Sequence, residues 1–416
     1  MNEQLVVKNF GPITDATVDF KRVTVFIGPT GGGKSTLAKL AAVFRDKKYD
    51  YVGSKNYSKP KDEPCLSDYN MEKFSSEDSD ILFNSLISEK FFSFEHDRVM
   101  VKLDDAIEDE IQVSIKENNK LLEYIQEILG NNDKLKLYSK NEIGEMISKS
   151  RENLENIITK NVTGGFPNSS IYIPAERVFL SAIEYSWAGL MRDDVGLPKI
   201  LLEFANEYSL SRKNIQELDI PFFNVKYLHI NGRDFIKIFE REEPLMLLEA
   251  ASGIQSVTPL LVLLEHLSRN TEQAQSFIIE EPELNLYPTA QRDLVYWLLE
   301  KCTQGDNDLT ITTHSPYVLS ALNLALYAGK VAALFPHQRQ KVTKIIPEKY
   351  WLKADEFSAY HVAGGGVKSI FDAKTGLLSE SQLDEVSGHF ADVFDRLTDL
   401  RVPEKKAPAK AKPVKK

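Results

Sequence analysis

A glycine-rich stretch near the N-terminus has the residue types and spacing of a phosphate-binding loop. Residues 23–38 read VTVFIGPTGGGKSTLA and fit the pattern G-x-x-x-x-G-K-[ST]. The glycines let backbone N–H groups turn toward an anion, Lys34 can reach the β- and γ-phosphates of ATP, and the Ser35 hydroxyl can hold Mg²⁺. The flanking residues predict a buried strand before the loop and a helix after it. The candidate nucleotide-binding residues are Gly28, Pro29, Thr30, Gly31, Gly32, Gly33, Lys34, Ser35 and Thr36.

Two adjacent carboxylates follow a second apolar run. Residues 276–283 read SFIIEEPE, which predicts a buried strand that delivers Glu280 and Glu281 to its C-terminal end. Phosphoryl transfer uses one such acid in the Mg²⁺ shell and another to orient or deprotonate water. A third strand, LTITTH, ends at His314, and Ser315-Pro316 then predicts a helix start.

Between these elements, residues 248–267 open with small residues and continue as an apolar helix. Ser252 and Gly253 would lie at its N-terminus, where a hydroxyl and free N–H groups can receive a phosphate. Alone, this pair is a weak signal, because Ser-Gly before a helix is usually just a cap. The ordered set of phosphate loop, Ser-Gly helix, acid pair and histidine favours a nucleotide site.

These motifs together resemble the ABC-type ATPase heads of the RecF, SMC and OLD group, especially stand-alone ATPases of bacterial antiphage systems of the PARIS, Septu or retron type. GPTGGGKST matches the Walker A motif, ASGIQ resembles the ABC signature, FIIEEPELNLYP is similar to Walker B with its D-loop, and TTHSPYVL is similar to the switch-histidine motif. The resemblance covers residues 1 to about 375, apart from residues within the lid and the helical insertion.

The resemblance implies a role for each matching position. Lys34 binds phosphate, Ser35 and Glu280 hold Mg²⁺, and Glu281 is the catalytic base. His314 senses the γ-phosphate. The residues expected at the nucleotide of an opposite subunit or in the D-loop are Ser252, Gly253, Gln255 and Asn285.

The chain departs from the family pattern in three places. Glu280 stands where Asp is more usual, and the signature is shorter than LSGGQ. The Q-loop glutamine has only Gln112 and Gln126 as candidates, both by default.

The composition describes an ordinary soluble chain that we expect in the cytoplasm. Of 416 residues, 42% are hydrophobic and 27% charged, and Cys65 and Cys302 are too few and too distant for a disulfide framework. No apolar run reaches the 18 or so residues of a membrane span, so we expect no membrane partner. The net charge of −10 gives no general attraction to nucleic acid, which leaves at most weak contacts. The basic tail 401–416 reads as disordered, either a solubilising tail or a DNA-binding arm.

The remaining segments predict the supporting architecture. Residues 4–27 alternate as a strand meander feeding the loop, and 46–80 read as a loop or lid. A helical hairpin at 115–160 is either a packed subdomain or a partner-binding protrusion. The strand at 170–178 ends in Glu176-Arg177, which could belong to a site or form a surface ion pair. Asn231-Gly232 predicts a hairpin turn within 222–239.

The fold class we expect is α/β: a P-loop NTPase with an ABC-type head, a mixed sheet, an antiparallel β subdomain and a helical insertion. The head would span 1–45 and 166–350, the lid and insertion 46–165, and a hairpin with an amphipathic helix 351–400. The apolar stripe of that last helix would cover the core or dock a second protein.

We therefore expect an ATPase whose heads associate as a homodimer or higher homo-oligomer when ATP is bound. The resemblance implies a sensor that controls a separately encoded effector, a nuclease or toxin, in antiphage defence. The alternative is a DNA-repair or chromosome-structural ATPase that acts on DNA directly.

Overall fold

The computed structural model describes residues 3–46, 50–52, 65–84, 88–93, 98–103, 169–183, 197–269 and 274–379. The helical hairpin expected at 115–160 lies outside these residues, together with Gln112, Gln126 and the tail 401–416. The C-terminal amphipathic helix expected at 379–400 also lies outside them, apart from its first residue.

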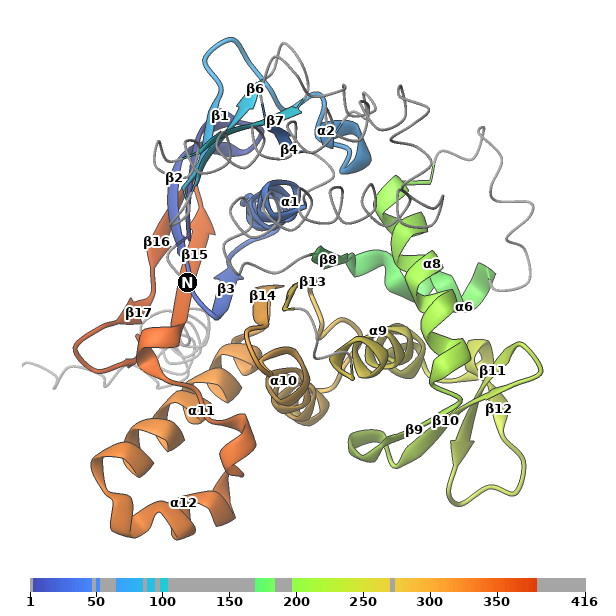
Figure 1. The fold of residues 1–416 in the computed structure, drawn as a ribbon. Coiled ribbons are helices and arrows are strands. Elements are labelled where there is room, and N and C mark those ends of the chain that lie inside the picture. The colour runs from blue at the N-terminus through green and yellow to red at the C-terminus, as the bar shows by residue number, and fades with distance from the viewer. Residues whose placement is uncertain are drawn as a thin grey trace, which may run out of the picture.

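A twelve-stranded mixed sheet forms the centre of the described chain (Figure 1). The strands run parallel from β15 to β8, and most strands of the other half are antiparallel. This arrangement confirms the α/β class with a mixed sheet. In spatial order the strands are β4 (Asp50–Val52), β7 (Arg98–Leu103), β6 (Ser88–Ser93), β5 (Asp80–Asn84), β1 (Glu3–Phe10), β2 (Ile13–Phe20), β16 (Gly366–Ser369), β15 (Phe357–Ala363), β3 (Val23–Ile27), β14 (Asp308–Thr313), β13 (Gln275–Glu280) and β8 (Ser169–Ile173).

Helices cover both faces of the parallel strands. The phosphate-loop helix α1 (Lys34–Arg45) packs on one face, and α9 (Ser252–Ser268), α10 (Pro288–Cys302) and α11 (Pro316–Leu334) pack on the other (Figure 1). In β3, Val23 and Val25 enter the core with α9 to α11, and Phe26 enters the core with α1. Because strands covered on both faces are mostly apolar, the short runs VTVFI of β3 and SFII of β13 lie buried within the sheet.

The meander expected at 4–27 is wrong in one respect. β1 and β2 form an antiparallel hairpin, but β15 and β16 lie between β2 and β3. The C-terminal hairpin predicted from residue 357 onward supplies these two strands, and its β15 lies parallel to β3, with His361 opposite Ile27. Alternating hydrophobicity defines a strand but not its neighbour, so the sequence could not place this hairpin.

A smaller antiparallel sheet forms the predicted β subdomain beside α8 (Lys199–Asn214). Its strands are β12 (Leu245–Met246), β11 (Arg233–Ile238), β10 (Val225–Ile230) and β9 (Glu217–Ile220). Asn231 and Gly232 have φ of 52° and 78°, which is the left-handed pair that a tight hairpin turn requires. The buried Asp234 carboxylate joins this sheet to α8, because it accepts hydrogen bonds from Tyr208 and Tyr227.

Short elements complete the described chain. Within 46–80, expected to be a loop, β4 and α2 (Cys65–Asp68) are ordered elements. The other short elements are η2 (Ala175–Val178), α6 (Phe179–Ile183), η3 (Pro221–Phe223), η4 (Leu247–Glu249), η5 (Pro336–Gln338), α12 (Arg339–Ile345), η6 (Glu348–Tyr350), η7 (Ala354–Glu356), β17 (Phe371–Asp372) and β18 (Leu377–Leu378).

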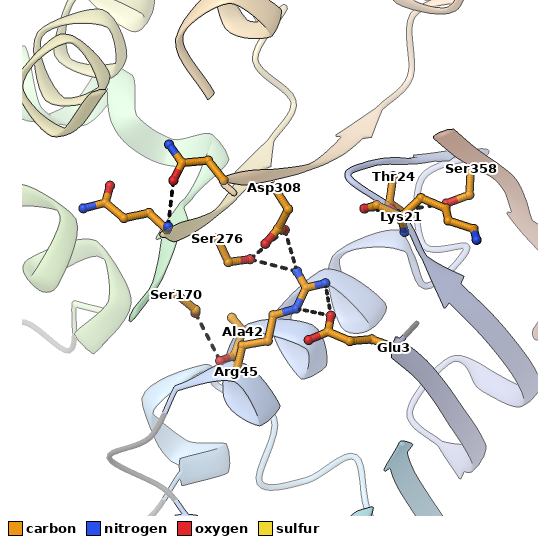
Figure 2. Close-up of polar contacts among 11 residues, drawn as sticks. Glu3, Lys21, Thr24, Ala42, Arg45, Ser170, Ser276, Asp308 and Ser358 are labelled. Carbon is orange, nitrogen blue, oxygen red and sulfur yellow. Dashed lines mark hydrogen bonds and ion pairs between the residues drawn. The ribbon is translucent and has the colours of Figure 1, made fainter. Parts of the chain in front are cut away.

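One buried arginine joins distant parts of the chain at the end of the sheet opposite the phosphate loop. Arg45, at the end of α1, bonds Glu3 of β1, Ser276 of β13 and Asp308 of β14 (Figure 2). Its guanidinium also lies 4.5 Å above the ring of Phe20. A buried cation is stable only when it is paired and hydrogen-bonded, and these partners satisfy it.

The helix α11 is long and apolar enough to cross a membrane by length and composition, with a mean hydropathy of 1.4. Val318, Leu322 and Leu326 are buried in the main core against the sheet. Packing accounts for these buried residues, whereas Leu324, Tyr327 and Leu334 of the same helix are exposed.

Candidate nucleotide-binding site

The phosphate loop connects the C-terminal end of β3 to the N-terminus of α1, as predicted. Its glycines are required by backbone geometry. Gly28 has φ 155°, and a Cβ atom there would lie 2.2 Å from the carbonyl oxygen of Val362 in β15. Gly33 has φ 104°, and a Cβ atom would lie 2.4 Å from Ile13 Cδ1. The hairpin β15–β16 and strand β2 thus leave no room for a side chain at these two positions of the loop.

Lys34 is folded back onto the loop. Its Nζ donates to the carbonyl oxygens of Gly28 and Pro29 at 3.0 and 3.1 Å and lies 3.1 Å from Nε2 of His314. The residue is 4% exposed. Burial lowers the pKa of Lys34, and the neighbouring carboxylates, Glu281 foremost, oppose that shift. The two carbonyl oxygens accept hydrogen bonds from the Lys34 ammonium group that phosphate oxygens could accept instead.

Glu280 ends β13 as a buried acid with an unused oxygen. It is 5% exposed, and its Oε1 has no hydrogen-bond partner among the described residues. Tyr172 of β8 lies nearby, and burial together with the Glu280 carboxylate raises the pKa of its hydroxyl. Carboxylate and hydroxyl oxygens are ligands of the kind that Mg²⁺ takes. Glu280 offers a buried carboxylate oxygen, and Ser35, the second residue of α1, offers an exposed hydroxyl.

Glu281 lies in a strained turn directly after β13. Its φ is 40°, an unusual value for a residue with a side chain, which costs about 1–3 kcal/mol. The turn is held because the Glu281 N–H donates to Thr312 O at 2.9 Å. It brings Oε1 of Glu281 to 2.8 Å from Nε2 of His314, which follows β14. The structure therefore groups Lys34, Glu281 and His314 at the ends of neighbouring parallel strands.

Arg177 supports this turn from behind and is not the surface residue that the sequence allowed. It is 0% exposed, and its guanidinium donates to the carbonyl oxygens of Glu280 and Glu281 at 2.7 and 2.6 Å. Burial lowers the pKa of Arg177 to about 10, and nearby carboxylates oppose the shift, so the side chain stays charged at neutral pH. Glu176 beside it is exposed.

A third acid, Glu283, was not singled out from the sequence. Its Oε1 accepts from Thr313 Oγ1 at 2.5 Å and from the His314 N–H at 3.0 Å, which fixes the backbone that carries the histidine. Burial raises the pKa of Glu283. The only sequence signal was its position two residues after the acid pair.

The Ser252-Gly253 pair lies at the start of α9, on the face of the sheet opposite α1 (Figure 1). Ser252 is exposed, and Gly253 is buried against the D-loop, where a Cβ atom would lie 2.7 Å from Asn285 O. Asn285 itself has φ 63°. The structure therefore brings the signature and the D-loop together, as one exposed corner.

Gln255 is used within its own chain. Its amide nitrogen donates to Leu248 O and Ala250 O at 2.9 and 2.7 Å, and its oxygen accepts from Ser181 Oγ at 2.7 Å. These bonds anchor the segment before α9. Gln255 therefore supports the signature segment in this structure.

Gln291 of α10 forms a similar link that the sequence did not indicate. Its side-chain oxygen accepts from Ser315 Oγ at 2.5 Å, and its nitrogen donates to Leu286 O at 2.9 Å. The D-loop and the helix that follows His314 are thus tied through one amide.

Comparison with known proteins agrees with this geometry. Residues 23–320 match the model of the family described as "AAA domain, putative AbiEii toxin, Type IV TA system". The chain belongs to this AAA family. The match runs from the phosphate-loop strand through the start of α11, so it includes the phosphate loop, the start of α9, the acid pair and His314. Family and topology together agree with the expected α/β fold of a P-loop NTPase.

Solved structures that match the chain include an SMC head domain and the recombination mediator RecF. An SMC head domain from Thermotoga maritima is 13% identical, with a TM-score of 0.37 over 89% of this chain and 98% of that chain. The recombination mediator RecF, in a structure titled "RecF-ATP", is 13% identical, with a TM-score of 0.31 over 88% and 99%. No curated protein matches the sequence.

Proposed function

We propose that this chain is an ATP-binding and ATP-hydrolysing switch whose heads associate when ATP is bound. The observation that carries the proposal is the grouping of Lys34, Glu281 and His314 at the ends of three adjacent parallel strands. A cation, a general base and an imidazole within hydrogen-bond reach at a phosphate loop are what phosphoryl transfer to water needs.

Each residue has a separate task in this proposal. Lys34 leaves the Gly28 and Pro29 carbonyls and binds the β- and γ-phosphates. Glu281 accepts a proton from the attacking water. His314, whose imidazole lies beside the Glu281 carboxylate, contacts the γ-phosphate. Ser35 and Glu280 would hold Mg²⁺, which supplies charge stabilisation to the phosphates.

The exposed Ser252 corner supports a shared site. A single head supplies the phosphate loop, acids and histidine, whereas Ser252 and Gly253 begin a helix on the opposite face of the sheet. Two heads related by a two-fold axis would each offer this corner to the other's nucleotide, since a two-fold interface presents the same surfaces reciprocally. Hydrolysis would then require association.

The experiment is to measure ATP hydrolysis per head against protein concentration, with oligomeric state followed by sedimentation. The rate should rise until association saturates. Ser252→Arg should block hydrolysis yet leave ATP binding intact, whereas Ser320→Arg, which adds the same side chain to an exposed position of α11, should not. Activity independent of concentration in a monomer would contradict the shared site.

Mixing two inactive variants gives a sharper result. Ser252→Arg and Lys34→Ala heads should restore part of the activity together, because a mixed dimer has one loop with Lys34 that faces an intact Ser252. Recovery absent at every mixing ratio, although mixed dimers form, would show that both sites must be intact or that Ser252 does not face the partner.

At a finer level, we propose a cytoplasmic regulator of a separate effector protein in antiphage defence. The family description, which refers to a toxin of a toxin–antitoxin system, supports this setting. The test is to co-express the chain with the products of neighbouring genes and to ask whether ATP binding changes their association. An effector whose binding and activity ignore Lys34→Ala would contradict this role.

The rival function is an ATPase that acts on DNA. With a net charge of −10, we expect no tight binding to duplex DNA, and any binding should fall steeply with salt. Nanomolar affinity near physiological salt, lost on deletion of residues 402–416, would favour the rival.

A further inference from the structure

Arg177 is unusual because it is an arginine without contact to water. Arginine is rarely buried unless a carboxylate pairs with it. Within the described residues, every hydrogen bond of Arg177 goes to a main-chain oxygen, that of Pro174, Glu280 or Glu281. Packing of the core would be served as well by an apolar side chain, so the guanidinium calls for a separate explanation.

The geometry of its contacts indicates what the guanidinium holds. Nη1 bonds Glu280 O and Nη2 bonds Glu281 O, so one rigid planar group spans the two peptide units that carry the acids. Glu281 is the residue with φ 40°. A planar fork that bonds both carbonyls fixes the turn and thereby the direction of the Glu281 carboxylate toward His314.

The same short segment reaches the signature helix. Arg177 belongs to η2 and Ser181 to α6, which follows η2 without interruption. Ser181 Oγ lies 2.7 Å from Gln255 Oε1, and Gln255 in turn bonds the carbonyls of Leu248 and Ala250 just before α9. One end of the segment therefore holds the acids, and the other holds the N-terminal region of the helix that carries Ser252.

We propose that residues 175–183 couple the two ATP sites of an associated pair of heads, with Arg177 as the positioning residue for Glu281 and Ser181 as the link to α9. This inference rests on the proposed function. In a pair, α9 of one head would face the partner's nucleotide and Glu281 would act on its own. Nucleotide bound at the partner's phosphate loop would contact α9 and shift it. Residues 175–183 would carry that shift to the Glu281 turn.

The first test separates positioning from general stability. Arg177→Lys keeps the charge but cannot bridge two carbonyls, so we expect kcat to fall by about 10- to 100-fold, the effect of a misplaced catalytic group, with ATP affinity unchanged. The matched control is Arg212→Lys, which alters a partly buried arginine that bonds Asp234 in the β subdomain. An equal loss of kcat in both variants, or loss of ATP binding in Arg177→Lys, would overturn the positioning role.

The second test addresses coupling. Heads with intact phosphate loops are titrated with Lys34→Ala heads until the ATP hydrolysis rate per intact loop is constant. That rate is compared with the rate per loop in a pair of wild-type heads. We expect a several-fold lower rate in the mixed pair, and Ser181→Ala in the intact head should abolish the difference. Ser320→Ala is the control, because the Ser320 hydroxyl donates to Pro316 O near the start of its own helix, as the Ser181 hydroxyl can to Val178 O.

The outcomes distinguish this inference from the proposed function on which it rests. An equal rate per loop in mixed and wild-type pairs, or a difference that survives Ser181→Ala, would overturn the coupling while ATP hydrolysis stands. A wild-type protein that binds but does not hydrolyse ATP would overturn the proposed function and this inference with it.

Discussion

Oε1 of Glu281 lies 2.8 Å from Nε2 of His314, although the two residues follow different strands. The contact exists because β13 and β14 are parallel neighbours in register, with Glu280 opposite Thr312. Parallel strands bring their C-terminal ends to one edge of a sheet, and Lys34 joins the pair from the next strand along.

The two adjacent acids should differ in function. Glu281→Gln should bind ATP normally but hydrolyse it at least about 100-fold more slowly, the scale of a lost general base, and should accumulate associated heads. Glu280→Gln should instead raise the Mg²⁺ concentration needed for activity, because Glu280 Oε1 is one of the buried carboxylate oxygens without a hydrogen-bond partner among the described residues. Single-turnover hydrolysis over a Mg²⁺ titration measures both. Normal turnover by Glu281→Gln together with lost turnover by Glu280→Gln would show that the roles are reversed.

Lys34→Ala should lower ATP affinity by about 100-fold, because a charged hydrogen bond to phosphate contributes up to about 3 kcal/mol. Lys39→Ala is the control on the same helix, since Lys39 Nζ bonds Tyr69 O rather than the loop. Equilibrium titration with a fluorescent ATP analogue is the measurement. Equal affinities for the two variants would remove Lys34 from the site.

Two loop glycines should differ in their tolerance of a methyl group. A Cβ atom at Gly28 would lie 2.2 Å from Val362 O, whereas one at Gly31 meets nothing within 4 Å, although both positions have positive φ. Gly28→Ala should therefore lose about 1–3 kcal/mol more free energy of unfolding than Gly31→Ala. Urea denaturation of the two variants is the comparison, and equal midpoints would mean that β15 yields to the loop.

Asp308 should make stability depend on pH near neutrality. Burial raises its pKa to about 6, Arg45 opposes this, and Glu3, which shares the guanidinium, adds to it. Because the folded value exceeds the unfolded value of about 3.9, the folded state holds the proton more tightly, so the stabilisation is present at low pH and is lost as pH rises through about 6.

Between pH 7 and pH 5, wild type should therefore gain about 1 kcal/mol of unfolding free energy relative to Asp308→Asn. The difference between the two proteins isolates this carboxyl from other titrating groups. Urea unfolding at pH 5, 6 and 7 measures it, and parallel pH curves would assign Asp308 an ordinary pKa.

The sequence indicated the parts of the site that lie in continuous motifs. The phosphate loop, Glu280-Glu281 and His314 each follow a short apolar strand, and a strand–turn pattern is a local signal that needs no knowledge of neighbours. The α/β class and the hairpin at Asn231-Gly232 were predictable for the same reason.

Non-local features were not predictable in this way. Arg177 follows an exposed Glu176, and an Arg-Glu pair after a strand ordinarily faces water, so its burial became visible only once β8 was placed beside β13. Nothing near β3 in the sequence indicates that β15 lies beside it. Glu283 and Gln291 likewise depend on which loops meet in space.

The pairing of β3 also affects how the protein can be made. Both neighbours of this early strand, β14 and β15, come from the last third of the chain, and Ile27 meets its partner His361 only when nearly all the described chain exists. At about 5–20 residues per second, a ribosome needs roughly 15–70 s to bridge that interval. The apolar strand 23–27 has no partner until β14 has been made, and it lacks its second partner until β15 follows. The nascent chain should therefore depend on chaperones that shield this strand until β14 and β15 have emerged.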